Sequence, residues 1–140
     1  MTMNDQWLVD RARRNSTITA SLKQRLEAIF EGEIDALWSA LGNETIRQAG
    51  VYNDAIGNPE ALAVGVGDDT VLVVVADGRE VEIRLHREQR AMTERYLDRG
   101  GVMRVRRPRI KFSVNAAGKL SFNFGGVDAA AGSILRRVIA

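Results

Sequence analysis

Five basic residues within the stretch GGVMRVRRPRIKFSV, residues 100–114, are the strongest candidates for binding chemistry in this sequence. They are Arg104, Arg106, Arg107, Arg109 and Lys111. Guanidinium groups form paired hydrogen bonds with phosphate or carboxylate oxygens. Alternate side chains of an extended strand lie about 6.6–6.8 Å apart on one face, so a basic strand face could follow the phosphates of DNA or RNA.

The apolar residues of this stretch change register at its centre. Met103 and Val105 stand at odd positions, whereas Ile110 and Phe112 stand at even ones, with Pro108 between the pairs. A bulge inserts one extra residue and would return all four to one face, so we expect a single edge strand over 102–114 with its bulge at 106–108. The five basic side chains then project from the opposite face.

Three interpretations of this basic face stay open. It could contact a nucleic-acid backbone, bind an acidic patch on another protein or on a second copy, or only protect an edge strand from unwanted pairing. Phe112, Phe122 and Phe124 fall on the apolar face, so none is placed to stack on bases. Sequence-specific recognition of single strands is therefore disfavoured.

The remaining residues give little support for catalysis. The chain has no cysteine and one histidine, His86, which excludes disulfides and cysteine nucleophiles and leaves an uncommon ligand set for zinc. We therefore expect no metal, no cofactor and no enzymatic activity. An enzyme would need Asp54, Glu80 and His86 to converge within hydrogen-bond reach.

Two other acidic or glycine-rich segments have structural interpretations. GVGDDT, residues 65–70, lacks the third glycine of a dinucleotide loop and precedes a strand, so Asp68 and Asp69 are expected to be turn residues. Glu31, Glu33 and Asp35 are expected on a solvated helix face, because positions two apart on a helix point in different directions.

The composition is that of one soluble globular domain spanning residues 1–140, with 45% apolar and 27% charged residues. The net charge is only +2 but is unevenly spread. Residues 79–111 contain eleven Lys or Arg against five Asp or Glu, which leaves nine against thirteen elsewhere. No apolar run reaches the roughly 20 residues of a membrane helix, and the polar N-terminus lacks the apolar core of a signal peptide.

Helices are indicated at five places, two of which are short segments over 5–14 and 44–49. The main helix is expected over 21–41, with Ser21 and Gln24 as a capping box and Gly42 as its stop. A short helix is expected over 88–99 and a C-terminal helix or tail over 127–140, capped by Asp128. Residues 51–61 are expected to form a loop.

Strands are indicated by alternation and turn signals. A three-strand meander is expected over 62–85, in which Asp77-Gly78 forms a two-residue turn that pairs Val74 with Val81 and Leu72 with Ile83. A basic hairpin is expected over 102–124, turning at NAAGK. Together these elements predict an α+β domain, with the long N-terminal amphipathic helix packed on a mostly antiparallel sheet of about five strands.

The hypothesis that follows is a non-enzymatic assembly or interaction domain, oligomeric, of the kind found among small virus-derived or accessory structural proteins. Residues 1–20, with Trp7 and the basic cluster Arg11–Arg14, are expected to be a docking arm. The alternative is a sequence-independent nucleic-acid-binding module using Arg104 to Lys111. Partners are another protein, a second copy, or a DNA or RNA backbone, and not a membrane. The cysteine-free composition favours a cytoplasmic location.

Overall fold

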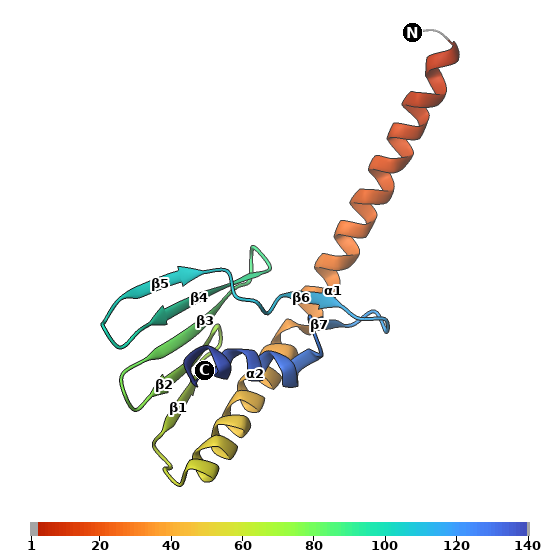
Figure 1. Ribbon diagram of the computed structural model, residues 1–140. Coiled ribbons are helices and arrows are strands. Elements are labelled where there is room, and N and C mark those ends of the chain that lie inside the picture. Colours follow the sequence, from red (N-terminus) through yellow and green to blue (C-terminus); the bar gives the residue numbers. More distant parts are fainter. Residues whose placement is uncertain (1–2, 140) are drawn as a thin grey trace.

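The computed structural model describes residues 3–139, and residues 1, 2 and 140 of the predicted arm and C-terminal segment lie outside that range. The elements follow in the order α1 (Met3–Ile56), β1 (Leu62–Val66), β2 (Thr70–Val75), β3 (Glu80–His86), β4 (Ala91–Leu97), β5 (Met103–Arg106), β6 (Phe112–Val114), β7 (Leu120–Phe122) and α2 (Gly126–Ile139) (Figure 1). The predicted α+β architecture is confirmed: a long N-terminal helix packs on a five-stranded antiparallel sheet, with a short C-terminal helix.

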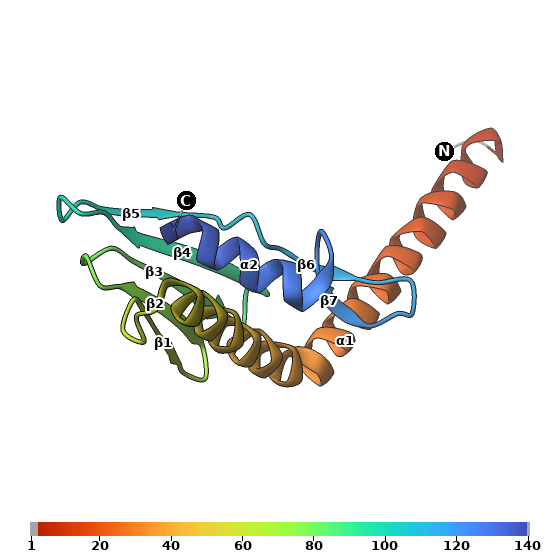
Figure 2. The ribbon, with the colours of Figure 1, turned by 60° about the horizontal axis from the view of Figure 1, so that its bottom comes forward.

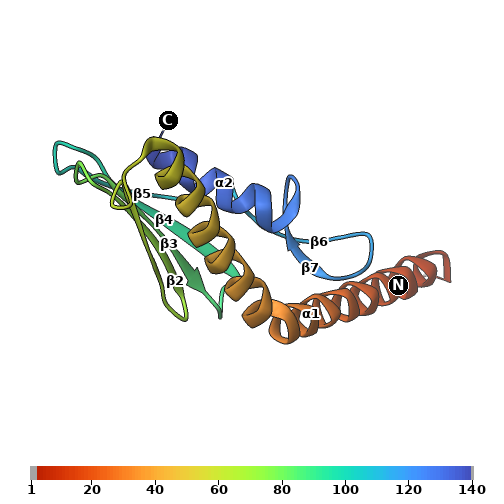
Figure 3. The same ribbon diagram turned by 90° about the horizontal axis from the view of Figure 1, so that it is seen from below.

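The five-stranded sheet is a meander whose spatial order is its chain order, from β1 to β5. The second half of α1 and the whole of α2 cover one face of it (Figures 2 and 3). The core between them contains Val71, Val73, Val81, Ile83, Leu85 and Met92 from the sheet and Phe30, Ile34, Trp38, Leu41, Ile134, Leu135 and Val138 from the helices. Within the described range, the opposite face of the sheet carries no helix.

Helix α1 is much longer than the predicted helix over 21–41. Ser21 is not a cap, since helical residues precede it, and Gly42 does not end the helix. Gly42 instead allows close packing, because a Cβ there would lie 2.6 Å from Cγ1 of Val66. The helix ends at Gly57, whose φ of 77° suits a residue without Cβ. The amides of Gly57 and Asn58 both bond to the carbonyl of Asn53, at 2.9 and 3.1 Å, so the expected loop over 51–61 begins only after Ile56.

The β2–β3 hairpin lies where Asp77-Gly78 predicted it, but its register differs by one residue. The loop has three residues, because the amide of Val75 bonds to the carbonyl of Arg79 at 2.8 Å. Gly78 takes the left-handed conformation, with a φ of 96°. The observed pairs are Val73 with Val81 and Val71 with Ile83. This register is favoured because all four side chains then lie in the core on one face.

The predicted helix over 88–99 is wrong, because this segment is strand β4. Its inward positions are Met92, Glu94 and Tyr96, so a charged residue stands at the centre of an otherwise apolar face. Because Glu94 interrupts the alternation of apolar and polar residues, the sequence did not show the pattern of a strand here. The segment pairs with β3 along its whole length, from Glu80–Leu97 to His86–Ala91.

The predicted single strand over 102–114 is also wrong. The chain leaves the sheet after β5 and forms β6 in a separate two-stranded sheet with β7. Pro108 and Ile110 are buried along the connection, whereas Met103 and Val105 are exposed on the helix-free face. The change of register at Pro108 therefore marks the point where the chain changes sheets, not a bulge. The turn at NAAGK is confirmed, with Phe112 opposite Phe122.

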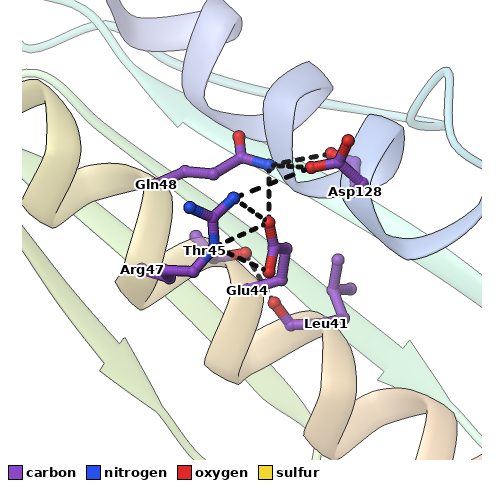
Figure 4. A network of polar contacts seen from close by, with 6 residues as sticks. All are labelled: Leu41, Glu44, Thr45, Arg47, Gln48 and Asp128. Atoms are coloured by element: carbon purple, nitrogen blue, oxygen red, sulfur yellow. Dashed lines mark hydrogen bonds and ion pairs between the residues drawn. The ribbon is translucent and has the colours of Figure 1, made fainter.

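Helix α2 packs against α1 through its buried positions, among them Ala130, Ala131 and Ile134. A polar network joins the start of α2 to the last quarter of α1 (Figure 4). The amide Nε2 of Gln48 donates to Oδ1 of Asp128 at 2.8 Å and to its carbonyl at 3.0 Å. Arg47 pairs with Glu44 at 2.6 Å on the same helix. Asp128 therefore links the two helices.

Candidate functional sites: an arginine pocket and a free helical arm

The structure separates the five predicted basic residues, although all five are exposed. Arg104 and Arg106 lie on β5 and stand opposite Tyr96 and Glu94, on the helix-covered side of the sheet. Arg107, Arg109 and Lys111 lie on the connection between β5 and β6. The continuous basic strand face is therefore absent. Two of the five, Arg106 and Arg109, are brought together in a pocket that Arg104, Arg107 and Lys111 do not line.

This pocket, here called the arginine pocket, has a volume of about 440 Å³. It opens between the sheet, the β5–β6 connection and α2. Its lining is Ile83, Glu94, Arg106, Pro108, Arg109, Ile110, Ser133, Ile134, Arg136 and Arg137. Four arginines and one glutamate give this lining a formal charge of +3, between apolar walls.

Glu94 fixes two of the four arginines. Its side chain is only 5% exposed, and its Oε2 accepts hydrogen bonds from Nε of Arg106 and, at 3.2 Å, from Nε of Arg137. The guanidinium of Arg137 also lies over the ring of Tyr96, with Cζ 4.0 Å from its centroid. A buried carboxylate needs such partners, because burial without them costs several kcal/mol.

The connection that holds Arg109 is anchored on both sides of that residue. Pro108 and Ile110 are buried, and Asn123 bonds to the backbone of the same segment. Its Nδ2 donates to the carbonyl of Arg109 at 3.2 Å, and its Oδ1 accepts the amide of Lys111 at 2.8 Å. Arg109 is thus presented from a fixed backbone and not from a loose loop.

A second cavity contains an arginine whose guanidinium group is hydrogen-bonded to acidic residues of the protein itself. It lies between α1 and the β1–β2 turn and is lined in part by Trp38 and Arg87. Arg87 donates to Asp69 at 2.7 Å, to Asp35 at 2.6 Å and to the carbonyl of Asp68 at 3.2 Å, and these carboxylates raise the pKa of its guanidinium. The cavity therefore has a structural explanation.

The acidic residues of α1 were expected on a solvated face, and two of them prove to have tertiary partners. Asp35 pairs with Arg87, and Oε1 of Glu33 accepts the amide of Leu120 at 3.1 Å. Asp68 and Asp69 are turn residues as expected, next to the start of β2.

Asp54, Glu80 and His86 do not converge. Glu80 and His86 are the first and last residues of β3, which separates them by about 20 Å at 3.3–3.4 Å per residue. Nε2 of His86 lies 2.8 Å from the hydroxyl of Thr93, and Asp54 lies in the last turn of α1. The acid–base set that an enzyme hypothesis required is not assembled from these three residues.

The second candidate site is the N-terminal half of α1, which projects away from the rest of the molecule (Figure 1). Every side chain from Asp5 to Leu26 is exposed, apart from the half-buried Val9. Contact with the body begins at Glu27, which pairs with Arg90 at 3.5 Å, and at Phe30, whose ring meets Phe112 edge-on. Residues 6–26, here called the free arm, are about 32 Å long at 1.5 Å per residue.

One side of the free arm carries a regular seam. Its residues alternate in steps of four and three: Leu8, Ala12, Asn15, Thr19, Leu22 and Leu26. That spacing is the heptad spacing by which helices pair with other helices. Leu22 and Leu26 belong to the helix predicted over 21–41, but they are 51% and 50% exposed and lie outside the core. Ile18 flanks the seam and is exposed as well.

The sequence alone missed half of the arginine pocket. Arg136 and Arg137 come from α2, and Glu94 comes from a segment predicted as helix. The signal that could have been used is the pair Arg136-Arg137 on a helix whose other face is apolar. Nothing local connects that pair with residues 106–109, because they meet only through the packing of α2 on the sheet.

Among residues 3–139, no group of three or more His, Cys, Asp or Glu side chains is arranged to hold a metal ion. No helix in the same range combines the length and the apolar character needed to cross a bilayer. In comparisons with known proteins, no family model, no curated protein and no solved structure matches this chain.

Proposed function

We propose that this protein is a non-enzymatic assembly domain that self-associates through the seam of its free arm. The observation that carries the proposal is the seam itself: six heptad-spaced, exposed residues on the part of α1 that projects from the body of the protein. A projecting helix with half-exposed leucines is unfavourable in water, and pairing removes that apolar surface from solvent.

A second copy in antiparallel orientation fits this seam residue by residue. With the two arms fully overlapped, heptad geometry pairs Leu8 of one copy with Leu26 of the other, Ala12 with Leu22, and Asn15 with Thr19. Large residues then meet at the ends, small meets large further in, and two polar side chains capable of hydrogen bonding meet near the middle. The two-fold axis lies level with residue 17, so the Ile18 side chains of the two copies flank the seam on either side of that axis.

The length of the arm supports the same arrangement. In this register residue 6 of one arm stands level with residue 28 of the other, next to the point where the body of the second copy begins. The two bodies then lie at opposite ends of the paired helices. In a parallel pair both bodies would lie at the same end of the paired helices. The body of each copy already covers one side of α1 at that end, so the two bodies would crowd each other.

Analytical ultracentrifugation at micromolar concentrations tests the proposal. We expect the mass to rise with concentration from the 15.4 kDa of one chain to twice that value. Leu22→Glu with Leu26→Glu should hold the protein as a monomer, because each dimer would then bury four carboxylates.

The matched control places the same two charges on the other side of the arm. Thr17 and Gln24 are exposed and lie about half a helical turn away from Leu26 and Leu22. Thr17→Glu with Gln24→Glu should leave self-association intact. A protein that stays monomeric at every concentration, or a control variant that dissociates as completely as the seam variant, would contradict the proposal.

Sequence-independent binding of a nucleic-acid backbone is the second candidate. Four basic side chains, those of Arg104, Arg107, Arg109 and Lys111, are exposed and form no ion pair with any described residue. If each neutralises one phosphate, log affinity for duplex DNA should fall against log salt with a slope of about −3.6. Binding that ignores salt would remove this candidate. For either function we infer a cytoplasmic site of action, in keeping with the absence of cysteine.

A further inference from the structure

The arginine pocket contains more positive charge than the protein's own groups neutralise. One carboxylate, Glu94, serves both Arg106 and Arg137. Arg109 and Arg136 form no side-chain hydrogen bond or ion pair with any residue between 5 and 139. We propose that this pocket is a binding site for a phosphate-bearing ligand with two or more negative charges. The proposal is independent of self-association by the free arm.

The two paired arginines are held ready for such a ligand. Arg137 uses Nε for Glu94 and rests its guanidinium plane on Tyr96, so its position is fixed. Its two Nη groups form no hydrogen bond to the described part of the chain. An arginine has five N–H donors, so each of these side chains can still donate to an oxyanion. Glu94 positions these donors. Its negative charge also reduces the net charge of the pocket from +4 to +3, and this is the charge that the ligand would neutralise.

The shape of the pocket favours a compact ligand. Its volume of about 440 Å³ falls in the range of small-molecule sites, and it is recessed between α2 and the sheet. Guanidinium forks match the oxygens of a phosphate group, and Ser133 adds a hydroxyl to the lining. Ile83, Ile110 and Ile134 offer apolar walls to an organic group carried by the phosphate.

Isothermal titration with inorganic pyrophosphate tests the site directly. We expect saturable binding of one pyrophosphate per chain. Arg109→Ala with Arg136→Ala should weaken that binding by at least about tenfold, because each substitution removes a charge-assisted hydrogen bond to the ligand. Both side chains are free of intramolecular partners in the described range, so the thermal unfolding of this variant without ligand should match that of the wild type.

The control removes the same charge elsewhere. Arg13→Ala with Arg14→Ala changes the net charge equally, but on the free arm and outside its seam. This control should bind pyrophosphate as the wild type does. Equal weakening in both variants would mean that net charge alone attracts the anion, and it would overturn the proposal, as would a wild type that binds neither pyrophosphate nor inorganic phosphate.

Competition identifies where the phosphate comes from. A short single-stranded oligonucleotide is added to the protein saturated with pyrophosphate. If it displaces pyrophosphate and needs Arg109 and Arg136 to do so, the site takes a nucleic-acid phosphate. If it does not displace pyrophosphate, the site takes a soluble phosphorylated compound. Sedimentation of the Arg109→Ala, Arg136→Ala variant should still show self-association, so the two proposals can fail separately.

Discussion

Arg137, near the end of α2, donates a hydrogen bond through Nε to the buried carboxylate of Glu94 on β4, with 3.2 Å between the two atoms. The two residues are 43 positions apart in sequence. This contact and the one from Arg106 explain how the charged side chain of Glu94 can lie on the buried face of the sheet. It also makes the C-terminal helix and β4 depend on each other.

Glu94→Gln should lower the free energy of unfolding by about 1–3 kcal/mol, because it removes the charge that balances two arginines at a buried position. Urea unfolding measures this. Glu80→Gln is the control, since Glu80 is half-buried on the neighbouring strand and has no hydrogen bond or ion pair to a described residue; its change should stay within about 0.5 kcal/mol. Equal losses in the two variants would contradict the role given to Glu94.

Phe122→Ala should destabilise the protein by about 3–5 kcal/mol, because Phe122 is buried and stacks on Phe112, which in turn meets Phe30 of α1. Phe124→Ala, two residues later, should cost less than about 0.5 kcal/mol, because that ring is 87% exposed. The sequence pattern predicted that both rings lie on the apolar face, which would give similar losses for the two variants. The structure predicts a large loss only for Phe122→Ala, so the two unfolding curves distinguish these expectations. A large loss at Phe124 would show that the hairpin is packed differently.

Gly32→Ala should stabilise the protein by about 0.8–1 kcal/mol, because the position is helical and a Cβ there meets no atom within 4 Å. Gly42→Ala introduces the same methyl group into the same helix but places it 2.6 Å from Cγ1 of Val66. We expect it to gain nothing or to destabilise. Melting temperatures measured side by side decide this, and a Gly42→Ala variant as stable as Gly32→Ala would refute the close contact of α1 with β1.

Acid should weaken the network that joins α1 to α2. Hydrogen bonds from Arg47, and then from Gln48, lower the pKa of Glu44 from 4.5 to about 2. A carboxylate whose pKa is lower in the folded state stabilises the fold above its unfolded pKa, and this contribution is lost as the pH falls from about 4.5 to about 2. The difference in Tm between wild type and Glu44→Gln should therefore close over that range.

Glu31→Gln is the control for this pH experiment. It removes a carboxylate from an exposed position of the same helix, where no hydrogen bond or ion pair to a described residue is found. A Tm difference that closes in the same way for Glu31→Gln and Glu44→Gln would contradict the assignment to the network around Glu44.

The sequence by itself determined the features that depend on neighbouring residues. Asp77-Gly78 located a hairpin, NAAGK located a second turn, and the alternation of Leu62–Val66 marked β1. The spacing of Phe30, Ile34, Leu37 and Leu41 marked a helix with one buried face. These predictions were correct because turn conformation, alternation and helical periodicity are written within a few consecutive residues. The register of the β2–β3 hairpin was missed by one, because loop length is settled by which face is buried.

Only the tertiary structure decided which apolar residues have a partner and which charged residues do not. Leu22 and Leu26 continue the pattern of the core helix, yet the body ends before reaching them, so the same periodicity gives a core in one half of α1 and an exposed seam in the other. Glu94 made β4 look like a helix, because a buried carboxylate is tolerated only where distant arginines neutralise it. Arg106, Arg109, Arg136 and Arg137 form one pocket for the same reason: their proximity results from the packing of α2 on the sheet, which no local pattern encodes.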